Sequence, residues 1–158
     1  MSADRRQTAR SGPGSRPIGG RTQVLGVIGD PVEHTLSPAL QAAAVAATGL
    51  DYVYVPFRVG AEQLEAAIAG MRALRIRGLN VTVPHKPRVA RLVDELAPEA
   101  RAIGAVSTVA NLDGRLVGHN TDAFGVTQSL RFDLELPTLP PCVGLLGAGG
   151  AARAILYA

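Results

Sequence analysis

The sequence lacks several residue types that mark particular protein classes. Its 158 residues include no tryptophan, one cysteine and few aromatic residues, so a core would have to pack from alanine, valine and leucine. With Cys142 alone no disulfide can form within the chain, which makes a reducing, cytoplasmic compartment the expectation. Apolar neighbours at 143, 145 and 146 indicate that Cys142 is a small core residue and not a nucleophile.

The chain also has no long apolar run. A membrane-spanning helix needs roughly 18 apolar residues in succession, and the Ala-rich stretch at residues 39–50 is interrupted by Gln41, Thr48 and Gly49. Residues 1–22 are rich in Gly, Pro, Ser and Arg and lack the apolar segment of a secretory signal. We therefore expect a soluble protein without a membrane partner, preceded by a disordered basic tail at residues 1–22.

Positive charge is scarce outside that tail, and lysine is scarce everywhere. Residues 1–21 hold five arginines and one aspartate, which leaves 11 basic and 12 acidic residues in the remainder. The folded part is thus close to neutral, and we expect no nucleic acid partner. Lys86 is the only lysine in the sequence. Because an amine can exchange protons in a protein whereas a guanidinium stays charged, Lys86 is a candidate acid–base residue.

Strand-like and helix-like segments alternate from residue 23 onward. Apolar runs predict strands at 24–28, 52–57 and 78–83, and Asp113-Gly114 predicts a hairpin between 105–111 and 116–119. Helical spacing or a leading proline predicts helices at 39–48, 61–72, 87–92 and 98–103. Residues 120–122 offer caps for a further helix that runs to about residue 132. This alternation predicts an α/β fold with three layers and a mostly parallel sheet over residues 23–132.

A glycine-rich turn follows a proline-rich linker at residues 133–141. The chain continues CVGLLGAGGAARAILYA, which predicts an apolar strand, a turn and a helix. The turn, Gly147 to Ala152, fits the dinucleotide fingerprint G-x-G-x-x-A, in which glycines let backbone amides approach a pyrophosphate at the helix N-terminus. A turn of this kind can also be a close-packed connection only, and the residue that reads the ribose lies about 20 positions further on.

Two segments could place polar side chains in a pocket. Thr35 and Ser37 provide two hydroxyls before a helix, although the simpler interpretation is that Ser37 caps that helix. Asn80 and Thr82 alternate with apolar residues, so they should share one face of a strand.

Lys86 follows at the carboxyl end of the same strand, where open α/β sheets bind ligands. Asp122 is either a first-turn helix acid or a partner that holds the ammonium group of Lys86.

Five blocks of the sequence resemble the shikimate dehydrogenase family. They read GDPVEHTLSP at 29–38, GLNVTVPHK at 78–86, IGAVSTV at 103–109, GHNTDAFG at 118–125 and LLGAGGAA at 145–152. The resemblance implies reduction of 3-dehydroshikimate to shikimate with NADPH, a step of aromatic amino-acid (chorismate) biosynthesis. It also implies a substrate-binding domain at 23–132 and, at 142–158, the start of an NADP-binding Rossmann-like domain.

The resemblance further implies roles for single residues. Lys86 and Asp122 match the catalytic pair, and no metal is implied. The implied substrate-binding positions are Thr35, Ser37, Asn80, Thr82 and Ser107, and the implied cofactor-binding positions are Gly147, Ala148, Gly149, Gly150 and Ala151.

The chain departs from the family pattern in three ways. Thr35 stands where the family usually has serine, so it keeps the hydroxyl and adds a methyl group. Ser107 stands where the family has asparagine, which shortens the reach of the side chain and removes its amide donors. Family members also continue for roughly another hundred residues, a domain's length, so we expect the isolated chain to turn over poorly. The alternatives are a non-catalytic paralogue that binds shikimate or quinate, and a variant that uses quinate or NAD.

Overall fold

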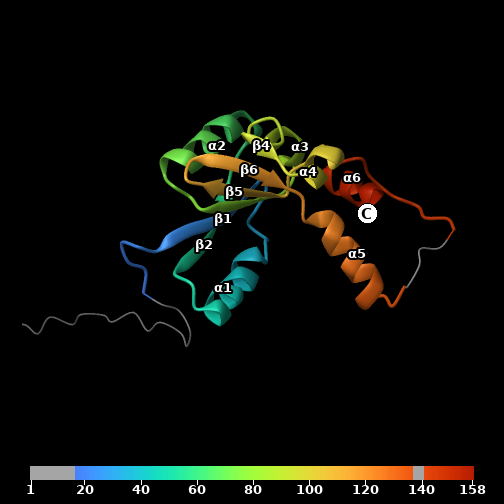
Figure 1. Cartoon of the computed structure of the whole chain (residues 1–158), viewed down its shortest axis with the longest axis horizontal. Coiled ribbons are helices and arrows are strands. Elements are labelled where there is room, and N and C mark those ends of the chain that lie inside the picture. The colour runs from blue at the N-terminus through green and yellow to red at the C-terminus, as the bar shows by residue number, and fades with distance from the viewer. Residues whose placement is uncertain (1–16, 137–140) are drawn as a thin grey trace, which may run out of the picture.

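The computed structural model describes residues 17–136 and 141–158, in which six strands form one sheet (Figure 1). The strand order is β2-β1-β3-β5-β6-β4, with β1 parallel to β2 and β3, β4 parallel to β6, and antiparallel pairing of β5 with β3 and β6. The α/β architecture with a mostly parallel sheet is therefore confirmed. The strands are β1 (Gln23–Gly29), β2 (Tyr52–Arg58), β3 (Gly78–Val81), β4 (Glu95–Leu96), β5 (Thr108–Leu112) and β6 (Arg115–His119).

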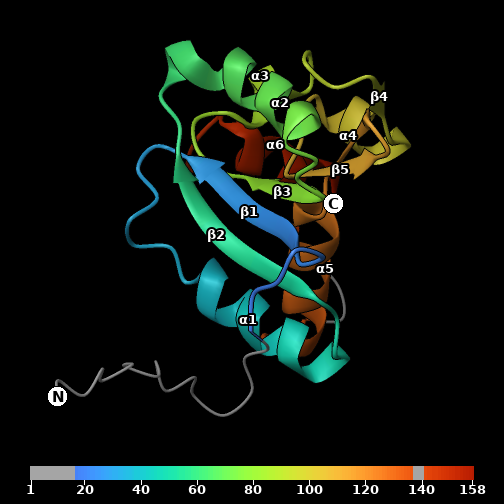
Figure 2. The ribbon, with the colours of Figure 1, turned by 90° about the vertical axis from the view of Figure 1, so that its left-hand side faces the viewer.

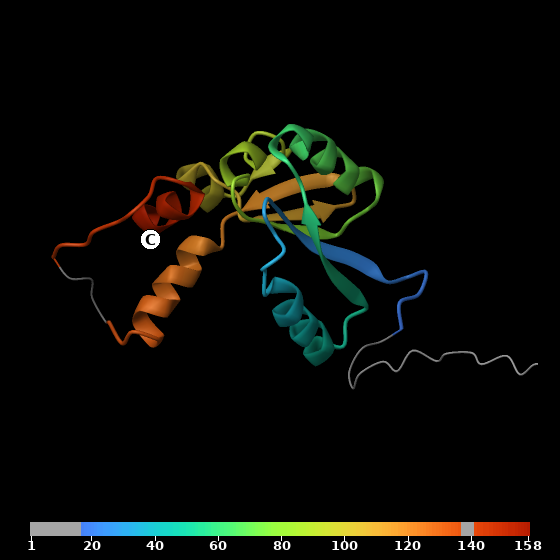
Figure 3. The ribbon, with the colours of Figure 1, turned by 180° about the vertical axis from the view of Figure 1, so that it is seen from behind.

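Helices lie on both sides of this sheet. Figure 2 shows α2 and α3 on one side of β1 and β2 and α1 on the other, while Figures 1 and 3 show α5 and α6 together beyond the sheet. None of the helices in the described ranges is long and apolar enough to cross a membrane. The helices are α1 (Ser37–Thr48), the 3-10 turn η1 (Ala61–Gln63), α2 (Leu64–Ala73), α3 (Lys86–Val89), α4 (Pro98–Ile103), α5 (Asp122–Phe132) and α6 (Gly150–Tyr157).

The main core lies between the sheet and α2. Leu64, Ile68 and Met71 follow the spacing of one helix face, and each is at most 2% exposed. They belong to one buried cluster with strand residues such as Leu79 and Leu116. Alternate residues of β3 are buried, so Asn80 belongs to the opposite face of the sheet, where the polar side chains gather.

The predicted hairpin is confirmed, including the chemistry of its turn. Asp113 and Gly114 have φ values of 54° and 97°, and they connect the directly paired residues Leu112 and Arg115. A two-residue turn with both φ values positive matches the twist of the flanking strands, and Asp-Gly is a favoured pair for it. The hairpin directs the segment after His119 back toward the end of β3.

The prediction of a strand at the start of the last segment is wrong. Residues 141–149 have no strand, Val143 is 59% exposed and Leu146 is fully exposed. Cys142 is exposed as well, so its assignment to a core is also wrong. The physical reason is that a strand needs a neighbour to pair its backbone groups, and within the described ranges none lies beside this segment.

Several boundaries also differ from the prediction. β3 ends at Val81 rather than at residue 83, because the amide of His85 donates to the carbonyl of Thr82 and starts a turn. The helix predicted at 87–92 is α3, which begins at Lys86 and ends at Val89. Residues 1–16 of the predicted tail and 137–140 of the predicted linker lie outside the described residues.

Candidate active site

A cavity of about 390 Å³ lies at the carboxyl ends of β1 and β3. Its size falls within the usual range for small-molecule sites, and the carboxyl end of parallel strands is where open α/β sheets bind ligands. His34 lines the cavity, and Lys86 is adjacent to it through Asp122. The lining residues that carry a hydroxyl, amide or carboxylate group are Thr35, Ser37, Asn80, Thr82, Ser107, Thr121 and Asp122.

The two hydroxyls before α1 point into one cavity, and Ser37 is not a helix cap. Thr35 Oγ1 accepts a hydrogen bond from the amide of Ser37 (3.2 Å) and donates to Ser37 Oγ (3.1 Å). This local turn places Ser37 inside the first turn of α1, where the N-cap is Leu36 without a side-chain cap bond. The predicted capping role is therefore wrong, and both hydroxyls remain available to a ligand.

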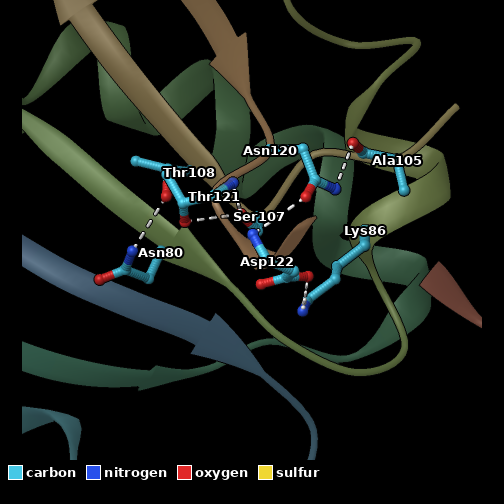
Figure 4. Close-up of polar contacts among 8 residues, drawn as sticks. All are labelled: Asn80, Lys86, Ala105, Ser107, Thr108, Asn120, Thr121 and Asp122. Carbon is cyan, nitrogen blue, oxygen red and sulfur yellow. Dashed lines mark hydrogen bonds and ion pairs between the residues drawn. The ribbon is translucent and has the colours of Figure 1, made fainter. Parts of the chain in front are cut away.

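Asn80 is oriented by side chains from two other strands, and Figure 4 shows its contact with Thr108. The hydroxyl of Tyr54 in β2 donates to Asn80 Oδ1 at 2.7 Å, and Asn80 Nδ2 donates to Thr108 Oγ1 in β5 at 3.2 Å. Burial raises the pKa of the Tyr54 phenol more than its hydrogen bond with Ser37 lowers it, so the hydroxyl stays a donor. In the sequence, Tyr54 is one residue of an apolar strand, and nothing in that pattern indicates its contact with Asn80.

Ser107 and Thr121 form a second polar wall of the cavity. Thr121 donates its amide to Ser107 Oγ at 2.9 Å, and the two hydroxyls are 3.2 Å apart. Ser107 is only 5% exposed, at the position just before β5. Thr121 was not predicted as a site residue, because residues 120–122 were interpreted as the start of a helix. Thr82 lines the same cavity from the turn after β3 and not from the strand itself.

Lys86 and Asp122, 36 residues apart in sequence, form an ion pair (Figure 4). Lys86 Nζ lies 2.6 Å from Asp122 Oδ2, and their side chains are 15% and 28% exposed. Each is the first residue of its helix, α3 or α5. Asn120 fixes the backbone of Asp122. Asn120 Oδ1 accepts a hydrogen bond from the amide of Asp122, and Asn120 Nδ2 donates to the carbonyl of Ala105, both at 3.0 Å. A charge-assisted bond of this length is strong and well oriented.

The residue before Lys86 anchors its loop. His85 is fully buried, and its Nε2 lies 2.7 Å from the carbonyl of Val59 after β2. Within the described part of the chain its Nδ1 has no hydrogen-bond partner. A buried histidine fixed by one hydrogen bond restrains the turn from which Lys86 projects. His34, by contrast, lies at the cavity as an exposed loop residue.

The glycine turn lies next to the ion pair. Gly147 has a φ of 114°, a conformation that favours glycine. Among the residues that the structure describes, chain neighbours aside, no atom lies within 4 Å of a Cβ built on Gly147 or Gly149. The open space at these two positions fits a phosphate that approaches the backbone at the start of α6. Gly150 differs, since a Cβ there would lie 2.8 Å from Lys86 Cβ. The turn and Lys86 are therefore in direct contact.

Comparison with known proteins identifies the family. The family model described as the shikimate dehydrogenase substrate binding domain matches residues 27–109. This chain belongs to the shikimate dehydrogenase family. The matched range contains Lys86 and all five predicted substrate-binding residues, whereas Asp122 and the glycine turn lie beyond it.

Three relatives illustrate the similarity. The shikimate dehydrogenase (NADP(+)) of Geobacter metallireducens is 52% identical over 137 residues, which cover 87% of this chain and 48% of the relative. The structure of the Thermus thermophilus shikimate 5-dehydrogenase with NADP(H) and shikimate matches this chain with a TM-score of 0.79 and 39% identity. The match covers 85% of this chain and 51% of the Thermus chain. The structure of the Listeria monocytogenes enzyme, solved with shikimate and NAD, matches with a TM-score of 0.81 and 40% identity. That match covers 90% of this chain and 49% of the Listeria chain. The chain thus spans about half the length of these proteins.

Proposed function

We propose that this chain supplies the substrate-binding half of a shikimate dehydrogenase, which reduces 3-dehydroshikimate to shikimate with NADPH. The observation that carries the proposal is the Lys86–Asp122 pair, 2.6 Å apart, beside a cavity lined with hydroxyl and amide groups. Named relatives at about half identity are NADP(+)-dependent, which supports the choice of cofactor. The reaction belongs to aromatic amino-acid biosynthesis, and we assign it to the cytoplasm because the chain has a single cysteine.

The cavity offers complementary groups for each part of such a substrate. The hydroxyl of Ser37 donates to the substrate carboxylate next to the first turn of α1, and Thr35 joins it by exchanging its hydrogen bond to Ser37 for one to the carboxylate. Asn80, Thr82 and Ser107 bind the ring hydroxyls, because amides and hydroxyls can both donate and accept. Tyr54 and Thr108 hold Asn80 in place, so its amide is already oriented when the ligand arrives.

Lys86 supplies the proton of the reaction. When bound, NADPH provides the hydride that reaches the carbonyl carbon of the substrate. The ammonium group of Lys86 then gives its proton to the carbonyl oxygen, which becomes the new hydroxyl, and Asp122 keeps the side chain directed by its ion pair. In the reverse direction the neutral amine takes the hydroxyl proton. Gly147, Ala148 and Gly149 would hold the pyrophosphate at the start of α6.

Titration of shikimate into the isolated chain tests the proposal. We expect saturable chemical-shift changes at Thr35, Asn80 and Lys86, and weaker binding in Thr35→Val, which keeps the side-chain shape but loses the hydroxyl. The loss should be about tenfold to a hundredfold, the contribution of one hydrogen bond to a charged group. Thr48→Val is the matched control, since that hydroxyl bonds the carbonyl of Ala44 within α1. An absence of changes around the cavity would refute a shikimate site.

A quinate arm of the same titration tests a second candidate. The observation that favours it is Ser107, whose short side chain is engaged with Thr121 and leaves space where the family has asparagine. Quinate has a saturated ring with an additional hydroxyl on the carbon that bears the carboxylate, and the space beside Ser107 would let this bulkier ring shift within the cavity. Tighter binding of quinate than of shikimate would assign the chain to a quinate-using branch.

A further inference from the structure

Gly150 stands at a position where nucleotide binding does not require glycine. In the G-x-G-x-x-A fingerprint the constrained positions are Gly147, Gly149 and Ala152, so Gly150 falls on a free position. Its φ is not among the positive values in the chain, so its backbone would accept any residue. Neither phosphate binding nor the backbone conformation requires glycine at position 150. The remaining explanation is that a side chain at this position has no room.

That space is filled by Lys86. A Cβ built on Gly150 would lie 2.8 Å from Lys86 Cβ, 3.2 Å from Lys86 Cδ and 3.4 Å from Ala105 Cβ. Carbon atoms prefer separations of about 3.5–4.0 Å, so the first of these contacts would be a clash. Around a Cβ built on the neighbouring Gly149, no atom of the described residues lies within 4 Å, chain neighbours aside. The two adjacent glycines therefore differ in what they contact.

Neither side of this contact can easily move away. The carbonyl of Lys86 accepts a hydrogen bond from the amide of Val106 at 2.9 Å, which ties the lysine backbone to the segment before β5. On the other side, Ala154 of α6 is fully buried in a cluster with Ile103, Ala105 and Ala123. Because Lys86 Cβ is attached directly to a fixed backbone, a side chain at position 150 would displace either α6 or the lysine.

We propose that Gly150 is a positioning residue for Lys86. Its missing side chain lets the first turn of α6 close against the stem of the lysine and hold the ammonium group beside Asp122. The role of Lys86 in proton transfer rests on the proposed function, but the contact itself does not. A consequence is that the nucleotide-binding turn and the acid–base pair move together, since a shift of α6 changes the packing of the lysine stem.

The single lysine makes this testable without signal assignment. Labelling with [13C,15N]-lysine gives side-chain signals from Lys86 alone. We expect Gly150→Ala to move the Lys86 Cε–Hε signal toward its position in Asp122→Asn, where the ion pair is absent. Gly149→Ala, the same substitution one residue earlier, should leave the signal at its wild-type position. Coincidence of the Gly150→Ala and wild-type signals would overturn the proposal.

A measurement on the unsubstituted chain covers the case in which Gly150→Ala does not fold. The short separations predict nuclear Overhauser contacts between the Hα protons of Gly150 and the Hβ and Hδ protons of Lys86. Their absence in a folded sample would refute the contact. Both experiments use the chain without any ligand, so their outcome is separate from the shikimate titration: failure of that titration would remove the proposed function and leave this inference standing.

Discussion

At the scale of single residues, the cavity combines one ion pair with a set of neutral hydrogen-bonding groups. The neutral groups are mostly oriented by each other: Tyr54 and Thr108 hold Asn80, and Thr121 holds Ser107. Such prearranged donors and acceptors need little reorganisation when a polyhydroxylated ligand binds. The lysine is different, because its ammonium group is held by Asp122 while its stem packs against Gly150.

Replacement of Ser107 by asparagine should strengthen shikimate binding. The serine hydroxyl is engaged with Thr121, and an asparagine would extend an amide donor into the cavity. One added hydrogen bond of about 1 kcal/mol corresponds to roughly fivefold higher affinity, measurable by NMR titration or calorimetry. Ser129→Asn on α5, which is not a lining residue, is the control and should leave the affinity unchanged. Equal or weaker binding by Ser107→Asn would contradict the expectation.

Local sequence pattern identified the polar residues of the cavity but not their contacts. The strand pattern placed Asn80 on the polar face of β3, because strand geometry is local, whereas Thr82 reaches the cavity from the turn after the strand. The pairing of Lys86 with Asp122 could not be derived, since it depends on how α3 and α5 meet at the end of the sheet. Tyr54 and Thr121 were missed for the same reason: their partners come from other elements, and nothing adjacent in the sequence marks them.

At the scale of elements, α2 ends in a strained conformation. Arg75 follows the helix with a φ of 52°, and it is stabilised there by hydrogen bonds from its own amide to Arg72 and from the amide of Ile76 to Met71. This left-handed conformation costs a residue with a Cβ about 1–2 kcal/mol, and glycine is the usual occupant.

We therefore expect Arg75→Gly to raise the free energy of unfolding by about 1 kcal/mol, part of the gain being offset by the greater flexibility of glycine in the unfolded chain. Urea denaturation measures the difference. Arg101→Gly is the control, because it places glycine inside α4, where it should cost about 1 kcal/mol. Destabilisation by both substitutions would show that the conformation at Arg75 is not strained.

Asp94 connects α2 to the strands on the opposite side of the core. It accepts from Arg72 Nη2 at 2.6 Å and from the amide of Leu116 at 2.7 Å. The Arg72 side chain, followed by the Leu116 amide, holds the pKa of Asp94 below its usual value. A carboxylate with a lowered folded-state pKa contributes stability that is present above its unfolded pKa, about 3.9, and is lost as the pH falls through the folded pKa.

The stability difference between the wild type and Asp94→Asn should therefore be largest near neutral pH and should shrink as the pH falls below about 4. Urea midpoints measured from about pH 7 to about pH 3 follow this change. Asp133→Asn, at the exposed end of α5, is the control and should follow the wild-type profile. A difference independent of pH would mean that the charge of Asp94 plays no part.

Strands and helices with a clear periodic pattern of apolar residues could be predicted from the sequence. Segments that become strands only when another strand pairs with them could not. The helix α4 has its predicted bounds, and the hairpin forms around the predicted turn, although its first strand begins at Thr108 and not at residue 105. The apolar run at 142–146 has the composition of a strand, but in the described residues no strand pairs with it. The two residues of β4 have too short a pattern to predict, and they form a strand because β6 lies beside them.

In the molecule as a whole, these 158 residues provide more of the groups for substrate binding and proton transfer than of those for hydride transfer from NADPH. The cavity and the ion pair are enclosed by the sheet, α1, α3 and α5. The glycine turn is followed by α6, which packs on α4 and α5, but the segment before the turn is exposed at Val143 and Leu146. A dinucleotide would contact the start of one helix, which can bind a phosphate but cannot fix the position of a nicotinamide ring.

A polypeptide of residues 1–158 should consequently bind shikimate but reduce 3-dehydroshikimate with NADPH at least about a thousandfold more slowly than the full-length relative of Geobacter metallireducens. The loss reflects the missing alignment of hydride donor and acceptor, which can account for several powers of ten in rate. Absorbance of NADPH measures the rate, and a shikimate titration of the same sample verifies that the cavity is intact. An ordinary enzymatic rate, above about 1 s⁻¹, would show that the glycine turn and α6 are sufficient to hold the nicotinamide against the substrate.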